Sequence, residues 1–207
     1  MVLESDHTGA TPHGEALTRM LEWHRDFILR GYSLLRHIRG ELERTLSLRV
    51  LTYNGYVSRD GTGSGSNLRA EGALQTYLGI ALVPAESHPA DNDFAVLCVQ
   101  IRWLDRSPTA PILWAAVVRG HFDPAGPTSL DAYYTGVFPK LERARDPDAV
   151  PGSIEICSVP RANQPTLHVT GRYHEVPLVA LHDEASVRDL FVEPAVALWR
   201  SHLHGAA

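Results

Sequence analysis

Apolar side chains recur at alternating steps of four and three residues near the start of the chain, and this stripe constrains the fold more than any other feature. The stripe comprises Leu17, Leu21, His24, Ile28, Gly31, Leu35, Ile38 and Leu42, with Met20, Phe27 and Leu34 on its flank. Such spacing places side chains on one face of a helix. Thr11 followed by Pro12 is typical of a helix start, with threonine as the N-cap and proline in the first turn. We therefore expect a helix over about residues 14–46, roughly 50 Å long.

A helix of this length is long for the protein that contains it. A chain of 207 residues forms a domain with an expected radius of gyration near 17 Å, so a helix of ~50 Å would overhang it. The stripe could cover the domain's own sheet, or it could pack against another molecule, because overhanging apolar surface favours a partner. Gly31 would either divide the helix or allow close packing. The candidate interaction residues are Leu17, Leu21, Phe27, Ile28, Leu35, Ile38 and Leu42.

Four runs that are rich in β-branched and aromatic residues follow the helix, and they predict strands. They span residues 48–57, 73–83, 94–104 and 111–119. Their connections are short, polar and turn-like, which favours antiparallel neighbours because a parallel pair needs a longer crossover. We expect an antiparallel β-meander, with both sheet faces covered because several of the strands are apolar on both sides.

The second half of the chain predicts further helices and strands. Residues 128–143 read as a helix, and residues 153–158 and 166–181 read as strands, the second weakened by Gly171 and Pro177. Asp183 is expected to cap a last helix, which Pro194 should kink or split because proline removes one backbone donor. The predicted fold class is α+β, with a long N-terminal helix, an antiparallel meander sheet, and covering helices that include a C-terminal helix. We expect residues 1–13 to form a mobile leader and residues 14–207 to form one domain.

Charge and hydropathy argue against nucleic acid and membranes as partners. The formal net charge is −5 and Lys140 is the only lysine, which opposes binding to nucleic acid through its phosphates. No apolar run approaches the roughly 18 residues of a membrane-spanning helix, and the first residues lack the order of a secretory signal. Cys98 and Cys157 lie inside apolar, strand-like runs and are expected to act as small buried hydrophobes. We expect a cytoplasmic protein that binds neither membrane nor nucleic acid.

Motifs for phosphate and metal binding are absent or incomplete. The glycine-rich residues 60–67 match neither the P-loop nor the dinucleotide-binding pattern, and a hairpin loop explains them. His202 and His204 would point about 200° apart on a helix. Residues 182–184 read as a strand end and helix cap, and residues 121–123 read as a loop. Because neither H-E-x-x-H nor C-x-x-C occurs, we predict no metal and no cofactor.

One strand could carry chemistry on a single face. If residues 167–175 are extended, His168, Thr170, Arg172 and His174 project to the same side. Two imidazoles and a guanidinium could bind an anion or perform acid–base chemistry, and Cys157 could act as a nucleophile beside them. The alternative is an ordinary solvated strand face whose intervening residues are buried. No catalytic residue is assigned.

A second candidate set consists of polar residues inside otherwise apolar strands. These residues are Asn54, Gln75, Gln100 and Arg102. Buried polar groups need partners, so the four could converge on a ligand pocket or pair with one another and with chain ends. The predicted strands 48–57, 73–83, 94–104 and 111–119 contain no acidic residue, which argues against two-metal chemistry.

Three functional hypotheses remain after these observations. The first is a non-catalytic protein-interaction or regulatory domain that assembles with another protein or with itself, partly through the N-terminal amphipathic helix. The second is a domain that senses a small-molecule ligand in a pocket between sheet and helix. The third is an enzyme that uses the face carrying His168, Arg172 and His174.

Overall fold

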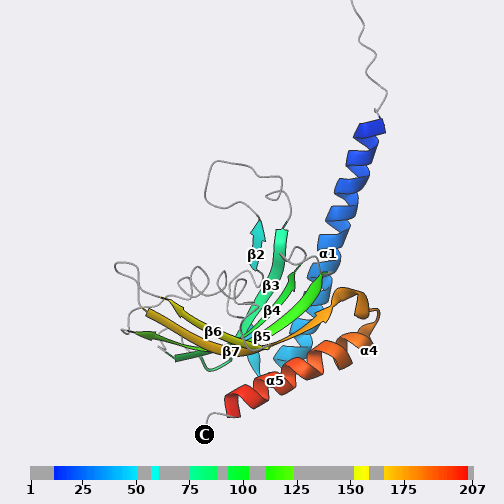
Figure 1. Cartoon of the computed structure of the whole chain (residues 1–207). Coiled ribbons are helices and arrows are strands. Elements are labelled where there is room, and N and C mark those ends of the chain that lie inside the picture. Colours follow the sequence, from blue (N-terminus) through cyan, green and yellow to red (C-terminus); the bar gives the residue numbers. More distant parts are fainter. Residues whose placement is uncertain are drawn as a thin grey trace, which may run out of the picture.

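The computed structural model describes residues 12–50, 57–60, 75–87, 93–102, 111–123, 152–158 and 166–204. In this part of the chain a long N-terminal helix, one antiparallel sheet and a C-terminal helical segment form an α+β fold, which confirms the predicted class (Figure 1). The predicted helix at 128–143 lies outside the described residues, as do Asn54 and residues 1–11 of the predicted leader.

The N-terminal helix α1 spans Pro12–Leu46 as one uninterrupted element of 35 residues. At 1.5 Å per residue its length is about 52 Å, as the apolar stripe predicted. Gly31 is buried inside the helix and does not divide it. The helix ends at Leu46. The backbone of the next residue, Ser47, adopts the left-handed region with φ of 52°, and the first strand follows directly.

Seven strands lie in the described part of the chain, and all of their pairings are antiparallel. The strands are β1 (Leu48–Val50), β2 (Val57–Asp60), β3 (Gln75–Pro84), β4 (Asp93–Arg102), β5 (Ile112–Asp123), β6 (Ser153–Ser158) and β7 (Thr166–Pro177). Their order is β1-β3-β4-β5-β7-β6, and β2 also pairs with β3. The expected meander is therefore confirmed for β3, β4 and β5, which are neighbours in chain order.

Several boundaries differ from the sequence prediction. The strand expected over 166–181 ends at Pro177, and a 3₁₀ turn occupies Leu178–Ala180. Two other strands extend further than expected. The residues 121–123 were expected in a loop, but β5 continues through Asp123 because His121 pairs with Asp93 in β4 and with His168 in β7. Residues 58–60 were expected in a turn, but they continue β2 along β3, with an irregularity between Arg59 and Asp60. In both places pairing with distant segments extends a strand past the point where local composition changes.

Both faces of the central strands are buried. One face packs against the second half of α1 and the C-terminal helices, where Leu35, Ile38 and Phe191 are fully buried. The opposite face is buried as well, as Cys98 and Trp114 demonstrate. The expectation of a sheet covered on both faces, with Cys98 as a buried side chain, agrees with this burial. The side chain of Cys157 in β6 lies outside the described residues.

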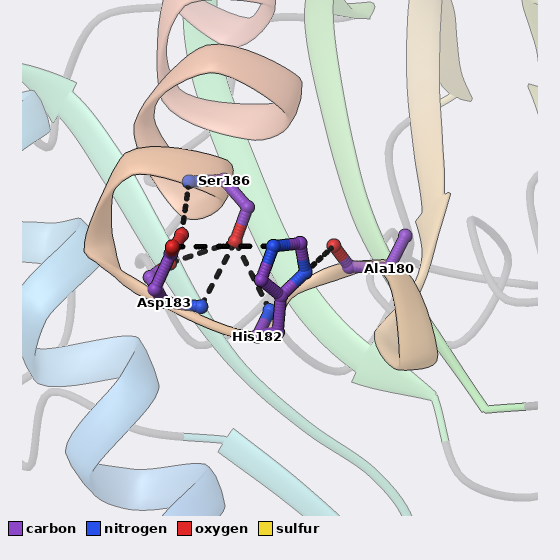
Figure 2. Close-up of polar contacts among 4 residues, drawn as sticks. All are labelled: Ala180, His182, Asp183 and Ser186. Atoms are coloured by element: carbon purple, nitrogen blue, oxygen red, sulfur yellow. Dashed lines mark hydrogen bonds and ion pairs between the residues drawn. The ribbon is translucent and has the colours of Figure 1, made fainter.

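The C-terminal segment begins with a cap that the sequence predicted. After the 3₁₀ turn η2 (Leu178–Ala180), helix α4 (Glu184–Val187) starts at Asp183, whose carboxylate accepts a 2.7 Å hydrogen bond from the Ser186 backbone N–H. The Ser186 hydroxyl in turn accepts from the backbone N–H of Asp183 at 3.0 Å, which completes a capping box (Figure 2). The backbone hydrogen bond from Ser186 is the largest of the effects that lower the pKa of Asp183.

Pro194 changes the helical pattern at the expected place. The π-helical turn η3 (Arg188–Val192) joins α4 to the last helix α5 (Glu193–His204), which contains the proline. The Glu193 N–H bonds to the carbonyl of Arg188, five residues earlier. An α-helix would bond the residue at position 194 to the Leu190 carbonyl, and proline has no N–H to donate. The helical segment thus continues through a wider π-helical turn and does not end at the proline.

Candidate functional site

The apolar stripe of α1 passes from the core into solvent without a break in its spacing. Leu35 and Ile38 are 0% exposed and pack in the core, whereas Leu17 and Leu21 on the same stripe are 53% and 56% exposed. Figure 1 shows the N-terminal half of α1 (dark blue) extending well past the sheet. The helix therefore has two environments along one face.

Further large apolar side chains surround the exposed end of the stripe. Met20 is 58% exposed, and Trp23 is 66% exposed although its ring stacks on Phe27 with centroids 5.2 Å apart. Of the seven large hydrophobic residues that are exposed in the described part of the chain, five belong to residues 17–29 of α1. We call Leu17, Met20, Leu21, Trp23, Phe27 and Ile28 the tip patch.

The charges beside the tip patch are balanced. Residues 14–30 carry three acidic and three basic side chains, namely Glu15, Glu22, Asp26, Arg19, Arg25 and Arg30. Arg19 lies 3.4 Å from Glu15 and Arg25 lies 3.3 Å from Asp26, in pairs that are largely exposed. Exposed pairs of this kind stabilise a protein by about 1 kcal/mol or less. Because acidic and basic residues are equal in number, residues 14–30 carry no net formal charge.

Two of the four predicted pocket residues come together in the sheet. Gln100 is 0% exposed and Arg102 is 4% exposed, and the Arg102 Nε donates a 2.9 Å hydrogen bond to the Gln100 Oε1. The Arg102 guanidinium lies 4.0 Å from the ring centroid of Trp114. Gln75 is in β3, but its side chain lies outside the described residues.

These two side chains lie on the face of the sheet opposite the helices. Gln100 pairs with Trp114 in register, whereas Leu113 and Ala115, the neighbours of Trp114, belong to the core under the helices. Gln100 and Arg102 therefore do not lie between the sheet and the helices α1 and α5, and the helix predicted at 128–143 lies outside the described residues. Alternation along the strand is the reason, because successive side chains point to opposite faces.

The Gln100 amide is only partly satisfied. Its Nε2 is buried and has no hydrogen-bond partner. Gly79 lies opposite Gln100, and a Cβ there would come within 2.9 Å of the Gln100 Cγ and of the Val99 carbonyl oxygen. The glycine thus leaves room for the glutamine. An unpaired buried donor is unusual in a folded protein and could bind a small polar ligand.

The strand face predicted to carry His168, Thr170, Arg172 and His174 is present, but these side chains differ in their surroundings. His168, Thr170 and Arg172 are exposed, and the intervening Val169 and Gly171 are buried. This alternation fits the interpretation of an ordinary half-buried strand.

His174 on the same face has a structural contact instead. It is partly buried, with its Nε2 2.8 Å from the Leu190 carbonyl oxygen and its ring beside Phe191. Cys157 pairs with His168 in register. Nothing in the arrangement joins His168 to His174 as one acid–base pair.

The structure brings Arg172 close to two residues that sequence reasoning did not select. Arg119 in β5 and His202 in α5 lie on the same side of the sheet as Arg172, and both guanidiniums act on the His202 ring. Burial is the largest cause of the lowered pKa of His202, followed by the positive charges of Arg119 and Arg172. No linear motif connects these residues, because β5, β7 and α5 each contribute one.

The same surface includes one further polar pair. The His121 Nδ1 lies 2.8 Å from the Asp93 carboxylate, and both side chains are largely exposed. No group of three or more histidine, cysteine or acidic residues suited to a metal ion occurs in the described part of the chain.

Comparison with known protein families, with characterised proteins and with solved structures gives no match. Within the described residues, no helix has the length and apolar character needed to cross a membrane.

Proposed function

We propose that this protein is a non-catalytic interaction protein that assembles through the tip patch of α1, and that the partner is a second copy of the same chain. One observation carries the proposal. A single apolar stripe is fully buried at Leu35 and Ile38, yet more than half exposed at Leu17 and Leu21. Removing such exposed apolar surface from water lowers the free energy, so contact with another surface is favourable.

The spacing of the exposed stripe suits another helix. Leu17, Leu21, His24 and Ile28 follow the steps of four and three that align side chains in paired helices. Trp23 and Phe27 widen this face with stacked rings, and large aromatic side chains supply much of the energy of protein interfaces.

A second copy fits the charge of the tip. With three acidic and three basic side chains in residues 14–30, two identical tips do not repel each other through net charge. An antiparallel overlap about a two-fold axis also opposes the two helix dipoles. It directs the two sheets to opposite ends of the assembly, so the bodies of the protomers do not collide.

The size of the tip indicates a modest affinity. A standard-size interface buries about 800 Å² on each partner. Residues 14–30 form only about 25 Å of helix, and one face of so short a helix buries less than that area. We therefore expect a reversible dimer with a dissociation constant near 1 μM or weaker.

Analytical ultracentrifugation at concentrations from about 1 μM to 1 mM tests the proposal. The variant Leu21→Asp/Ile28→Asp should remain monomeric at concentrations where the wild type dimerises. The control Thr18→Asp/Ser33→Asp adds the same charge at two exposed positions whose hydroxyls only bond to carbonyls of the same helix. Circular dichroism should report a folded protein for all three proteins.

Two results would contradict this function. The first is a wild-type protein that stays monomeric at every concentration. The second is a Leu21→Asp/Ile28→Asp variant that dimerises as strongly as the wild type, since the contact would then lie elsewhere.

A second candidate function, the sensing of a small-molecule ligand, is favoured by the unpaired buried Nε2 of Gln100 beside Arg102. A thermal-shift screen of small polar metabolites would test it, with Gln100→Leu as the matched variant. A compound that stabilises the wild type but not Gln100→Leu would support binding at this amide. Equal responses of the two proteins would rule the amide out.

A further inference from the structure

Two arginines occupy neighbouring strands on the side of the sheet that faces α5. Arg119 pairs with Thr170, and Arg172 pairs with Val117, so the two arginines are diagonal neighbours on one face. Diagonal positions lie about 7–8 Å apart, which long side chains readily bridge. Both are exposed, and neither has an ion pair or hydrogen bond within the described part of the chain.

His202 approaches the same place from α5. The helix packs on β5 and β7, and the His202 Nε2 is buried without a hydrogen-bond partner. The ring is close enough to both arginines for their charges to lower the pKa of His202, in addition to the larger effect of burial. Three nitrogen-bearing side chains thus surround one junction of β5, β7 and α5.

The side chains that the structure describes around the two arginines supply little compensating negative charge. The Asp93 carboxylate, which pairs with His121 two residues beyond Arg119, lies 2.8 Å from the His121 Nδ1. His168 and Thr170, the nearest residues on β7, carry no negative charge. Glu155 pairs with Thr170 in register, and its side chain lies outside the described residues.

Like charges on adjacent strands are unfavourable in the empty protein. An anion between the guanidiniums removes this repulsion, and guanidinium groups bind phosphate oxygens through paired N–H donors. A dianion also favours protonation of a nearby imidazole, which then becomes a further charged donor.

From this convergence we propose that Arg119, Arg172 and His202 form a binding site for a phosphate-class dianion at the junction of β5, β7 and α5. A tetrahedral dianion suits this arrangement because its oxygens can face two guanidiniums and an imidazole at once. A planar monocarboxylate has only two oxygens and half the charge. The site is distant in sequence from the tip patch and does not depend on the function proposed for it.

Nuclear magnetic resonance of the histidine rings provides the test. The His202 ring signals are followed through a pH titration, with and without inorganic phosphate at constant ionic strength. We expect saturable changes in the His202 signals and an increase in the pKa of His202 when phosphate binds. Acetate should have a much weaker effect.

Charge-removing variants locate the site. Arg119→Gln and Arg172→Gln should each weaken phosphate binding about tenfold or more, since each removes charge-assisted hydrogen bonds. Each should also raise the pKa of His202 in the absence of phosphate, because a neighbouring positive charge is gone. The control Arg36→Gln removes an exposed arginine on α1 and should leave both properties unchanged.

Two sources of the dianion can be distinguished with the same signals. Tighter binding of O-phosphoserine than of inorganic phosphate indicates a phosphate monoester, and the reverse indicates the free ion. The proposal is overturned if phosphate leaves the His202 signals unchanged. It is also overturned if the Arg119→Gln/Arg172→Gln double variant responds as the wild type does.

Discussion

The Nε2 of His174 lies 2.8 Å from the carbonyl oxygen of Leu190. In a regular helix this carbonyl would accept from the residue at position 194, which is a proline without an N–H. A carbonyl oxygen only accepts, so the His174 Nε2 carries the proton and supplies the missing donor. A side chain from β7 therefore completes the backbone bonding of the C-terminal helices.

This replacement predicts coupling between His174 and Pro194. His174→Ala should destabilise the fold by about 1 kcal/mol, because the Leu190 carbonyl loses its donor. In the background of Pro194→Ala, position 194 regains an N–H that can serve the same carbonyl, so His174→Ala should cost less. Urea unfolding of the two single variants and the double variant measures the interaction. Strictly additive changes in the free energy of unfolding would show that the two residues act independently.

Two glycines should respond to alanine in opposite directions. A Cβ at Gly171 would lie 2.4 Å from the Val117 carbonyl oxygen, so β5 and β7 would have to separate. We expect Gly171→Ala to destabilise the protein by about 1–3 kcal/mol. At Gly40, in α1, no atom lies within 4 Å of an added Cβ. Gly40→Ala should stabilise it by about 0.5–1 kcal/mol, because alanine favours helix. Thermal unfolding compares them, and equal midpoints would contradict the strand packing described here.

The buried Gln100 predicts a difference between two substitutions. Gln100→Leu removes the acceptor of the Arg102 Nε in a buried site and should cost about 2–3 kcal/mol. Gln100→Glu keeps an acceptor of similar size, removes the unpaired Nε2 and adds a charge opposite to that of Arg102. Its cost should be clearly smaller at neutral pH. Chemical denaturation measures both values, and a Gln100→Glu variant less stable than Gln100→Leu would contradict this prediction.

The cap at Asp183 predicts a particular acid dependence. Hydrogen bonds from Ser186 lower the pKa of Asp183 below its ordinary value of 3.8 in the folded protein. The unfolded chain therefore binds the proton first, so the contribution of this carboxylate is complete above 3.8 and is lost as the pH falls through the lower, folded value.

Asp183→Asn is the matched variant, because asparagine still caps a helix but does not titrate. The difference in melting temperature between wild type and variant should be constant near neutral pH and should shrink as the solution becomes strongly acidic. A difference that grows on acidification would have the wrong sign for this cap.

Features with local causes could be predicted from the sequence. The stripe from Leu17 to Leu42 determined the extent of α1 within a few residues, because helical periodicity is a property of neighbouring positions. The Asp183 cap and the limits of β6 also follow from short stretches of sequence. The place where Pro194 disturbs the helix was predicted for the same reason, since the lost donor belongs to one residue, but a kink or split was expected and the structure has a π-helical turn.

Features that depend on pairing between distant segments could not be predicted. The extension of β5 through Asp123 requires partners in β4 and β7. The cluster of Arg119, Arg172 and His202 requires the register of two strands and the path of α5 over them. The face on which Gln100 lies depends on which strand residues the helices cover.

The continuity of α1 has a consequence for how its exposed half folds. An isolated helix of fewer than about 12–15 residues is marginal in water, because its first turn must form without support. In this protein the turns around Leu35, Ile38 and Leu42 are anchored in the core. They act as a preformed nucleus, and the helix can propagate from them toward Pro12 without a nucleation step of its own. The outer turns are thus held in helical form in the free chain, so the docking that we propose would require little further ordering of the backbone.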